Sequence, residues 1–153
     1  MKTYIKELDS KKDSDLLFEI VKYEDEIFGE ASVGNWNIKP FAKYGKVFAI
    51  LTEKNEIISV IEVLSSFDRE KAYLYGVSTS KKFQKKGYGK KLLDYVLKYL
   101  IKIGIKTVEL TADEDNIIAQ NLYSQFRFEI VENLSNEYGD NVPRYLMRLD
   151  LKK

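Results

Sequence analysis

A short basic loop contains the residues whose types and spacing could do chemistry. Gly87 and Gly89 stand at the start of a long stretch with helical spacing of apolar residues, and Gln84 lies just before them. The first backbone N–H groups of a helix have no internal partners and point outward at the positive end of the helix dipole, so they can bind phosphate oxygens. The loop therefore predicts a site for a ligand with several phosphates, which the neighbouring lysines would attract. These lysines are Lys81, Lys82, Lys85, Lys86, Lys90 and Lys91.

The alternative is a helix that simply begins with two glycines and carries a solvated lysine face. The glycine spacing differs from the dinucleotide fingerprint and from the P-loop, so the loop alone does not decide. A second segment, residues 116–128, bears on the choice. On a helix, Asn116, then Ala119 or Gln120, and then Tyr123 fall on successive turns of one side, so an amide and a phenol would face the same ligand. Tyr123 could equally be an ordinary core residue.

The composition restricts the chemistry further. The chain has no cysteine and no histidine, which excludes thiolate nucleophiles, disulfides, most zinc sites and the usual base at neutral pH. We therefore expect no metal. A formal net charge of +1 gives no overall attraction to nucleic acid or membranes. No stretch approaches membrane-spanning length and residues 1–7 lack a signal-peptide pattern, so we expect a cytoplasmic protein without a membrane partner.

The elements that must position these residues follow from hydrophobic periodicity. With 153 residues, the chain fits one domain spanning 1–153. The order of elements is mixed α/β with antiparallel strands first. Strands are predicted at 2–8, 47–51, 57–64, 72–79, 106–112, 128–133 and 144–151. Helices are predicted at 10–28, 39–44, 88–102 and 115–125, the third of them stopped by Gly104.

Together the loop and the later segment resemble the GNAT superfamily of N-acetyltransferases. The loop matches that family's Gln/Arg-x-x-Gly-x-Gly/Ala motif, and residues 116–128 look like its Asn-x-x-Ala-x-x-x-Tyr helix followed by a Gly/Arg-Phe pair. The resemblance covers the chain from about Val47 to its end. It implies acetyl-CoA as co-substrate and a single mixed, mostly antiparallel sheet of about seven strands with helices on both faces. It also implies that the central strands splay to bind acetyl-CoA.

The resemblance also implies roles for individual residues. The backbone of Val77–Thr79 would pair with the pantetheine arm, while Asn116 would contact the cofactor further along. Tyr123 would sit beside the sulfur, where its hydroxyl could protonate the departing thiolate. The implied cofactor-binding residues are Val77, Ser78, Thr79, Gln84, Lys85, Lys86, Gly87, Tyr88, Gly89, Lys90, Asn116 and Tyr123.

The implied reaction is direct attack of a neutral amine on the thioester through a tetrahedral intermediate, which requires a base. The branch of the family that acetylates a ribosomal-protein N-terminus has a glutamate five residues before the motif asparagine, where this chain has Thr111. Threonine cannot serve as a base. Glu109 is the first substitute and Glu62 the second, although each could be a surface charge. Tyr73 and Tyr75 could organise a water chain instead.

The amine acceptor is less specified by the sequence. An acidic stretch interleaved with aromatic residues would suit a cationic amine, but a solvated helix face with Trp36 in a core explains the same pattern. These residues are Tyr23, Glu24, Asp25, Glu26, Phe28, Glu30 and Trp36. The connection 136–144, with Glu137 and Tyr138, could close over the acceptor. A polyamine, an aminoglycoside-like compound and a protein amine all stay open.

Two other functions compete with the enzyme. The lysine cluster with Phe83 and Tyr88 could bind nucleic acid, but the near-zero net charge and the unexplained glycines count against it. An acetyl-CoA-sensing domain without a working base would keep the fold and lose the transfer. A homodimer is also left open.

Overall fold

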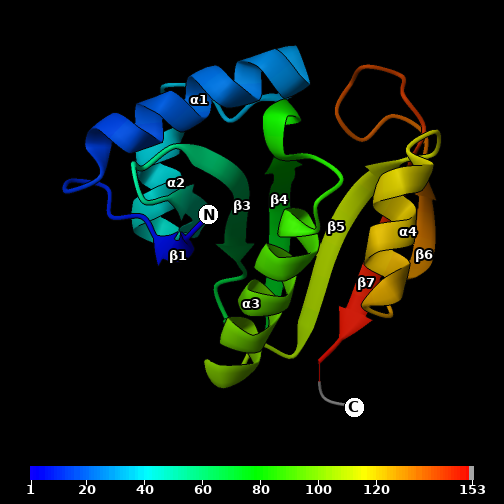
Figure 1. The fold of residues 1–153 in the computed structure, drawn as a ribbon. Coiled ribbons are helices and arrows are strands. Elements are labelled where there is room, and N and C mark those ends of the chain that lie inside the picture. Colours follow the sequence, from blue (N-terminus) through cyan, green and yellow to red (C-terminus); the bar gives the residue numbers. More distant parts are fainter. Residues whose placement is uncertain (152–153) are drawn as a thin grey trace. The chain divides into compact units, whose positions relative to one another are not determined.

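The structure, a computed structural model, describes residues 1–151. The strands are β1 (Thr3–Glu7), β2 (Lys46–Thr52), β3 (Ile57–Ser65), β4 (Lys71–Thr79), β5 (Thr107–Asp113), β6 (Glu129–Leu134) and β7 (Arg144–Asp150). The helices are α1 (Ser14–Phe28), α2 (Ile38–Tyr44), α3 (Tyr88–Lys102) and α4 (Ile117–Gln125), with 3-10 helices η1 (Gly29–Ala31) and η2 (Lys81–Phe83). Every predicted strand and helix is present (Figure 1).

The start of α1 differs from the prediction, which began this helix at Ser10. The carboxylate of Asp9 accepts the backbone N–H groups of Lys11 and Lys12 at 2.9 and 2.8 Å. The carboxylate of Asp13 in turn accepts the N–H of Asp9 at 2.7 Å. Short polar side chains that bond nearby backbone in this way favour turns over helix. The helix therefore begins only at Ser14.

The seven strands form one sheet in the order β1-β2-β3-β4-β5-β7-β6. The pairs β1–β2, β2–β3, β5–β7 and β6–β7 are antiparallel, whereas β4 and β5 run parallel. The parallel register joins Lys71–Tyr73 to Thr107–Glu109. The prediction of a mixed, mostly antiparallel sheet is thus confirmed.

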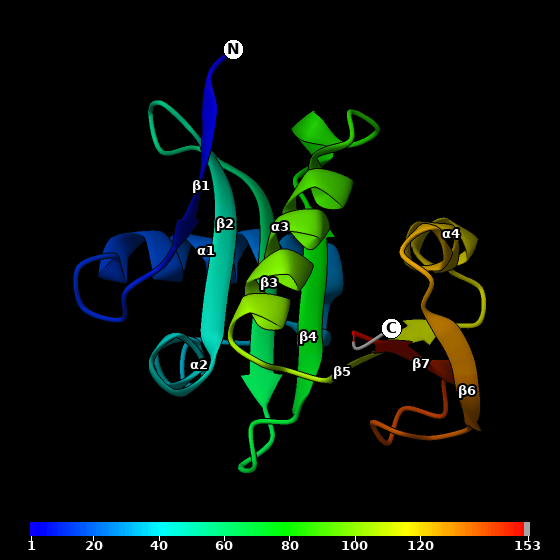
Figure 2. The same cartoon turned by 90° about the horizontal axis from the view of Figure 1, so that it is seen from below.

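The chain divides into two compact units. Unit 1 comprises residues 1–64 and 76–99, and unit 2 comprises residues 65–75 and the chain from Leu100 onward. In unit 1, helices cover both faces of the strands, because α1 and α3 lie on opposite sides of β2 and β3 (Figure 2). In unit 2, α4 runs beside β6 (Figures 1 and 2).

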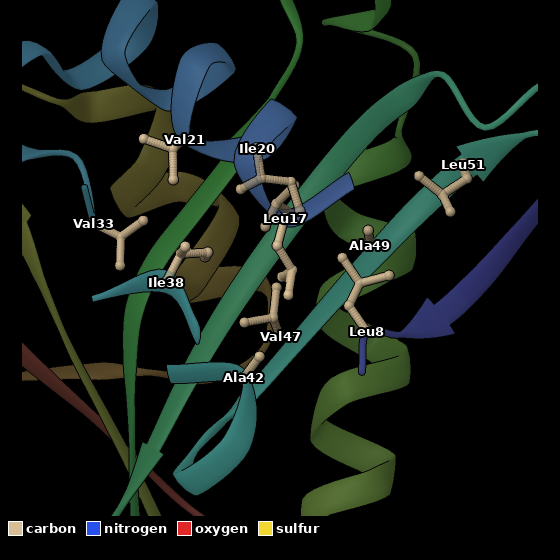
Figure 3. Close-up of a cluster of buried hydrophobic side chains, with 11 residues drawn as sticks. Leu8, Leu17, Ile20, Val21, Val33, Ile38, Ala42, Val47, Ala49 and Leu51 are labelled. Carbon is tan, nitrogen blue, oxygen red and sulfur yellow. The ribbon is translucent and has the colours of Figure 1, made fainter. Parts of the chain in front are cut away.

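Alternation along β2 places side chains on the two faces of unit 1. Val47, Ala49 and Leu51 join the apolar cluster under α1 and α2 (Figure 3). Phe48 points to the other face, where its ring packs edge-on against Tyr95 and Tyr99 of α3. The cluster consists of Leu8, Leu17, Ile20, Val21, Val33, Ile38, Ala42, Val47, Ala49, Leu51 and Val60.

Unit 2 has a smaller core. Val108, Leu110 and Ala112 of β5 are buried, and their neighbours on the other face of the strand are only partly buried. Tyr123 of α4 and Phe128 are also buried, with ring centroids 5.8 Å apart. Within residues 1–151, no helix is long and apolar enough to cross a membrane, and no cluster of three or more Asp or Glu side chains could hold a metal ion.

Candidate active site

The loop before α3 belongs to unit 1 and is held against the end of β4. The Gln84 side-chain amide donates a hydrogen bond to the Thr79 carbonyl at 3.0 Å. Gly87 has a φ of +84°, a conformation that favours glycine. At Gly89, an added Cβ would lie 3.2 Å from the Thr79 hydroxyl, so the first turn of α3 approaches β4 closely. Glycine at both positions therefore has a structural reason.

The start of α3 suits an anionic ligand. The first turn of this helix contains no acidic residue, and Lys85, Lys86, Lys90 and Lys91 around it are exposed. Lys82 is partly neutralised by an ion pair with Glu56 at 3.1 Å. Open helical N–H groups with several exposed lysines can attract and bind a phosphate-containing ligand.

The end of β4 is fixed by hydroxyl groups. The Ser59 hydroxyl donates to the Ser78 carbonyl at 2.7 Å and lies 3.1 Å from the Thr79 hydroxyl. The Tyr23 phenol donates to the Ser78 hydroxyl at 2.7 Å. Each carbonyl oxygen has a second lone pair, so Ser78 and Thr79 can still accept from a ligand amide. Val77, the third residue of this stretch, is partly buried.

Two carboxyl groups meet in the interior of unit 1. Glu24 of α1 and Glu62 of β3 are each 1% exposed. Burial raises the pKa of Glu62, and the charge of Glu24 together with the hydrogen bond between the two side chains raises it further. Burial also raises the pKa of Glu24, although hydrogen bonds from Glu62 and from the Val33 backbone partly offset this. At neutral pH, Glu62 therefore holds a proton that it donates to Glu24.

In the sequence, Glu24 is one member of an acidic stretch, and nothing in that stretch predicted this carboxyl pair. The helical spacing could have shown that Glu24 is buried, since it follows Leu17 and Ile20 on the buried side of α1. The alternative that placed Trp36 in a core is wrong, because this side chain is 93% exposed. It borders a hollow of about 560 Å³ lined by Phe18, Val21, Lys22, Asp25, Asn35, Trp36 and Lys39.

Unit 2 contains the predicted residues of the later segment. Asn116 caps α4, since its side-chain oxygen accepts the Ala119 N–H at 3.1 Å. Tyr123 lies in the second turn of α4 and is 6% exposed. Burial raises the pKa of its phenol to about 12, so the hydroxyl keeps its proton at neutral pH. Glu109 pairs with Arg148, whose Nε lies 2.7 Å from the carboxylate.

Three hydroxyl groups gather in unit 2. The phenols of Tyr73 and Tyr138 lie 2.5 Å apart, and the Thr111 hydroxyl lies 3.3 Å from the first and 2.9 Å from the second. We call these residues the hydroxyl cluster. Burial raises the pKa of the Tyr73 phenol well above its ordinary value. The sequence indicated Tyr73 and Tyr138 separately, but not that Thr111 joins them.

Arg144 anchors the connection that carries Tyr138. Its guanidinium bonds Asp113 at the end of β5 and Asp140 in the connection, both at 2.8 Å. It also lies 4.8 Å from the centre of the Tyr138 ring. These contacts hold Tyr138 within reach of Tyr73 and Thr111.

The predicted site residues are thus divided between the two units. Unit 1 contains Glu62, Val77–Thr79 and Gln84–Lys90, while unit 2 contains Glu109, Asn116 and Tyr123. Within unit 1, the loop and the end of β4 are joined by the bond from Gln84 to Thr79. Within unit 2, no hydrogen bond among the described residues joins Glu109 to the hydroxyl cluster.

The comparison with protein families decides the classification. The model described as "Acetyltransferase (GNAT) family" matches residues 4–128. This chain belongs to the GNAT acetyltransferase family. A ribosomal protein bS18-alanine N-acetyltransferase from Haemophilus ducreyi is 33% identical over 87 residues, which is 57% of this chain and 59% of that protein. The match therefore spans less than two thirds of that relative's length.

Solved structures share the GNAT fold at low sequence identity. Ard1 from Thermoplasma volcanium has a TM-score of 0.87 and 17% identity, with all of both chains covered. An aminoglycoside 6'-N-acetyltransferase in complex with coenzyme A has a TM-score of 0.82 and 15% identity, covering 98% of each chain. The spermidine/spermine N-acetyltransferase SpeG from Vibrio cholerae has a TM-score of 0.75 and 16% identity, covering 99% of this chain and 96% of that one.

Proposed function

We propose that this GNAT protein transfers the acetyl group of acetyl-CoA to a primary amine by direct attack on the thioester. The observation that carries the proposal is the loop Gln84–Gly89, closed onto β4 and followed by a helix start surrounded by exposed lysines. Such a loop fits the pyrophosphate of coenzyme A. The adjoining carbonyls of Ser78 and Thr79 can accept bonds from the amides of the pantetheine arm.

In this proposal, residues of both units serve one acetyltransferase domain spanning 1–153, as the match over residues 4–128 supports. Asn116 uses one lone pair of its side-chain oxygen to cap α4, so its amide nitrogen and the second lone pair remain available to the cofactor. A cytoplasmic location and a homodimer stay predictions.

Tyr123 acts as the donor to the departing sulfur. A phenol with a pKa of about 12 keeps its proton at neutral pH, so it can donate a hydrogen bond. An ordinary thiol has a pKa of about 8.5, so complete proton transfer to the thiolate would be uphill by roughly 5 kcal/mol. The environment of Tyr123 therefore favours a hydrogen bond that stabilises the developing thiolate over complete transfer of the proton.

The amine proton leaves through water held by the hydroxyl cluster. Glu109 is a poorer choice of base because Arg148 already occupies its carboxylate. Glu62 is also a poor base at neutral pH, since it already carries the proton of the buried pair. Tyr73, Thr111 and Tyr138 can each donate and accept hydrogen bonds, which lets them order a water chain.

A thiol-release assay with acetyl-CoA and a panel of small amines and peptides tests the proposal. The loop contribution is tested with Lys86→Ala, which should raise the KM for acetyl-CoA severalfold. Lys98→Ala is the control, because it removes the same charge further along α3, where Lys98 pairs with Asp94 at 2.8 Å. Acetyl-CoA that fails to bind the wild-type protein would refute the proposal. Tight binding without transfer to any amine would favour the sensing domain.

A further inference from the structure

The Glu24–Glu62 pair is electrostatically incomplete. One oxygen of each carboxyl group, Glu24 Oε1 and Glu62 Oε2, is buried and has no hydrogen-bond partner. Among residues 1–151, no lysine or arginine forms a salt bridge with either group. Buried polar atoms are almost always hydrogen-bonded, and buried charges are normally paired. The pair therefore lacks a donor, and a cationic donor would satisfy it best.

The surroundings of the pair fit such a donor. Glu62 occupies the space that a side chain at position 76 of β4 would need. An added Cβ on Gly76 would lie 2.6 Å from Glu62 Oε1 and 3.8 Å from Glu24 Oε2. The oxygens that face Gly76 are thus Glu62 Oε1 and Glu24 Oε2, the other two oxygens of the pair, and Gly76 itself is partly exposed. The Tyr23 phenol, which donates to the Ser78 hydroxyl, adds a hydroxyl oxygen close enough to feel the charges of both glutamates. Asp25, which follows Glu24, adds negative potential.

A primary ammonium group matches this set of acceptors. It carries one positive charge and three N–H donors, enough for both unpartnered carboxylate oxygens and one hydroxyl. Two carboxylates also keep a bound ammonium protonated, because nearby negative charge favours the charged form. The amine that attacks the thioester must be neutral. The pair therefore suits an ammonium group that stays charged and does not react.

We propose that the Glu24–Glu62 pair binds the non-reacting ammonium group of a diamine or polyamine acceptor, which replaces the proton shared by the two carboxyl groups. The inference rests on the proposed function, since it names the acceptor of the same acetyl transfer. Both carboxyl groups are 1% exposed, so a slim methylene chain is the shape that reaches them. Because both groups are buried, binding requires the structure around the pair to open.

The test compares 1,4-diaminobutane with butylamine, which has the same chain and no second ammonium group. Wild-type protein should have a KM for the diamine about tenfold or more below that for the monoamine, as a buried charged contact provides. Glu24→Gln and Glu62→Gln should each remove most of this preference. Glu19→Gln, an exposed change of the same charge on α1, should leave it intact.

Calorimetry without acetyl-CoA gives a readout that does not depend on transfer. The wild-type protein should bind the diamine and release a proton to the buffer, whereas the two glutamine variants should bind it at least tenfold more weakly. Equal binding by wild type and variants, or equal KM values for both amines in the wild type, would overturn the inference. Failure of transfer to every amine would instead reject the proposed function, and the calorimetry would still decide this site.

Discussion

Replacing Glu62 with glutamine changes how the stability of the protein depends on pH. The folded protein raises the pKa of Glu62 above that of an unfolded chain, because the side chain is buried beside Glu24. Between the two pKa values, the folded state binds a proton that the unfolded state has released. Stability is then fully present below the unfolded pKa and is lost as the pH rises toward the folded one.

The size of this pH dependence follows from the one extra proton that the folded state binds. Each pH unit in that interval lowers the free energy of unfolding by about 1.4 kcal/mol, so the loss from pH 6 to pH 8 is roughly 2.7 kcal/mol. The chain has no histidine and no cysteine, so few other side chains titrate in this range. Glutamine fills the same space, donates a hydrogen bond to Glu24 and does not titrate. The Glu62→Gln variant should therefore lose most of this slope and be more stable than wild type at pH 8.

Urea denaturation at pH 6, 7 and 8, with circular dichroism as the signal, measures how the free energy of unfolding changes with pH in the wild type and in Glu62→Gln. Glu19→Gln serves as the control, because Glu19 is exposed on α1 and should keep the wild-type slope. A wild-type stability that stays flat over this range would refute the reasoning. So would an equally steep loss of stability in Glu62→Gln.

Three further changes test the proposed catalytic and cofactor-binding residues. Tyr123→Phe removes the proposed donor to the sulfur and should lower kcat about 100-fold with little change in acetyl-CoA affinity; unchanged turnover would remove Tyr123 from the mechanism. Gly89→Val places a side chain against the Thr79 hydroxyl and should raise the KM for acetyl-CoA about tenfold while circular dichroism stays native. Tyr138→Phe removes a hydroxyl that contacts Tyr73 and should lower turnover severalfold at unchanged cofactor affinity; wild-type turnover would exclude the water chain.

Local signals explain what the sequence could predict. The bounds of α3 match the prediction because Gly104 ends the helix locally, with a φ of +91° and its N–H bonded to the Ile101 carbonyl. The loop before the helix was recognisable for the same reason, since Gln84, Gly87 and Gly89 lie within a few residues of each other. Such features are encoded within a single turn of chain.

Contacts between distant elements could not be predicted. The ion pair of Glu109 with Arg148 depends on the register between β5 and β7, which places these residues opposite each other. The hydroxyl cluster similarly joins Tyr73 and Thr111, residues from different strands. Periodicity assigns a residue to a face of a strand, but it does not give the partner across the sheet.

The two carboxyl groups that the sequence suggested as bases are therefore both poorly suited to that role. Glu109 would have to give up Arg148 before accepting a proton, and Glu62 already holds one. In the proposed mechanism a water chain through the hydroxyl cluster would conduct a proton outward but would have little basicity of its own, because the Tyr73 phenol stays protonated at neutral pH. The neutral fraction of the amine in solution then limits the rate. We infer that transfer accelerates as the pH rises toward the pKa of the acceptor amine, and that this dependence follows the amine rather than a carboxyl group of the protein.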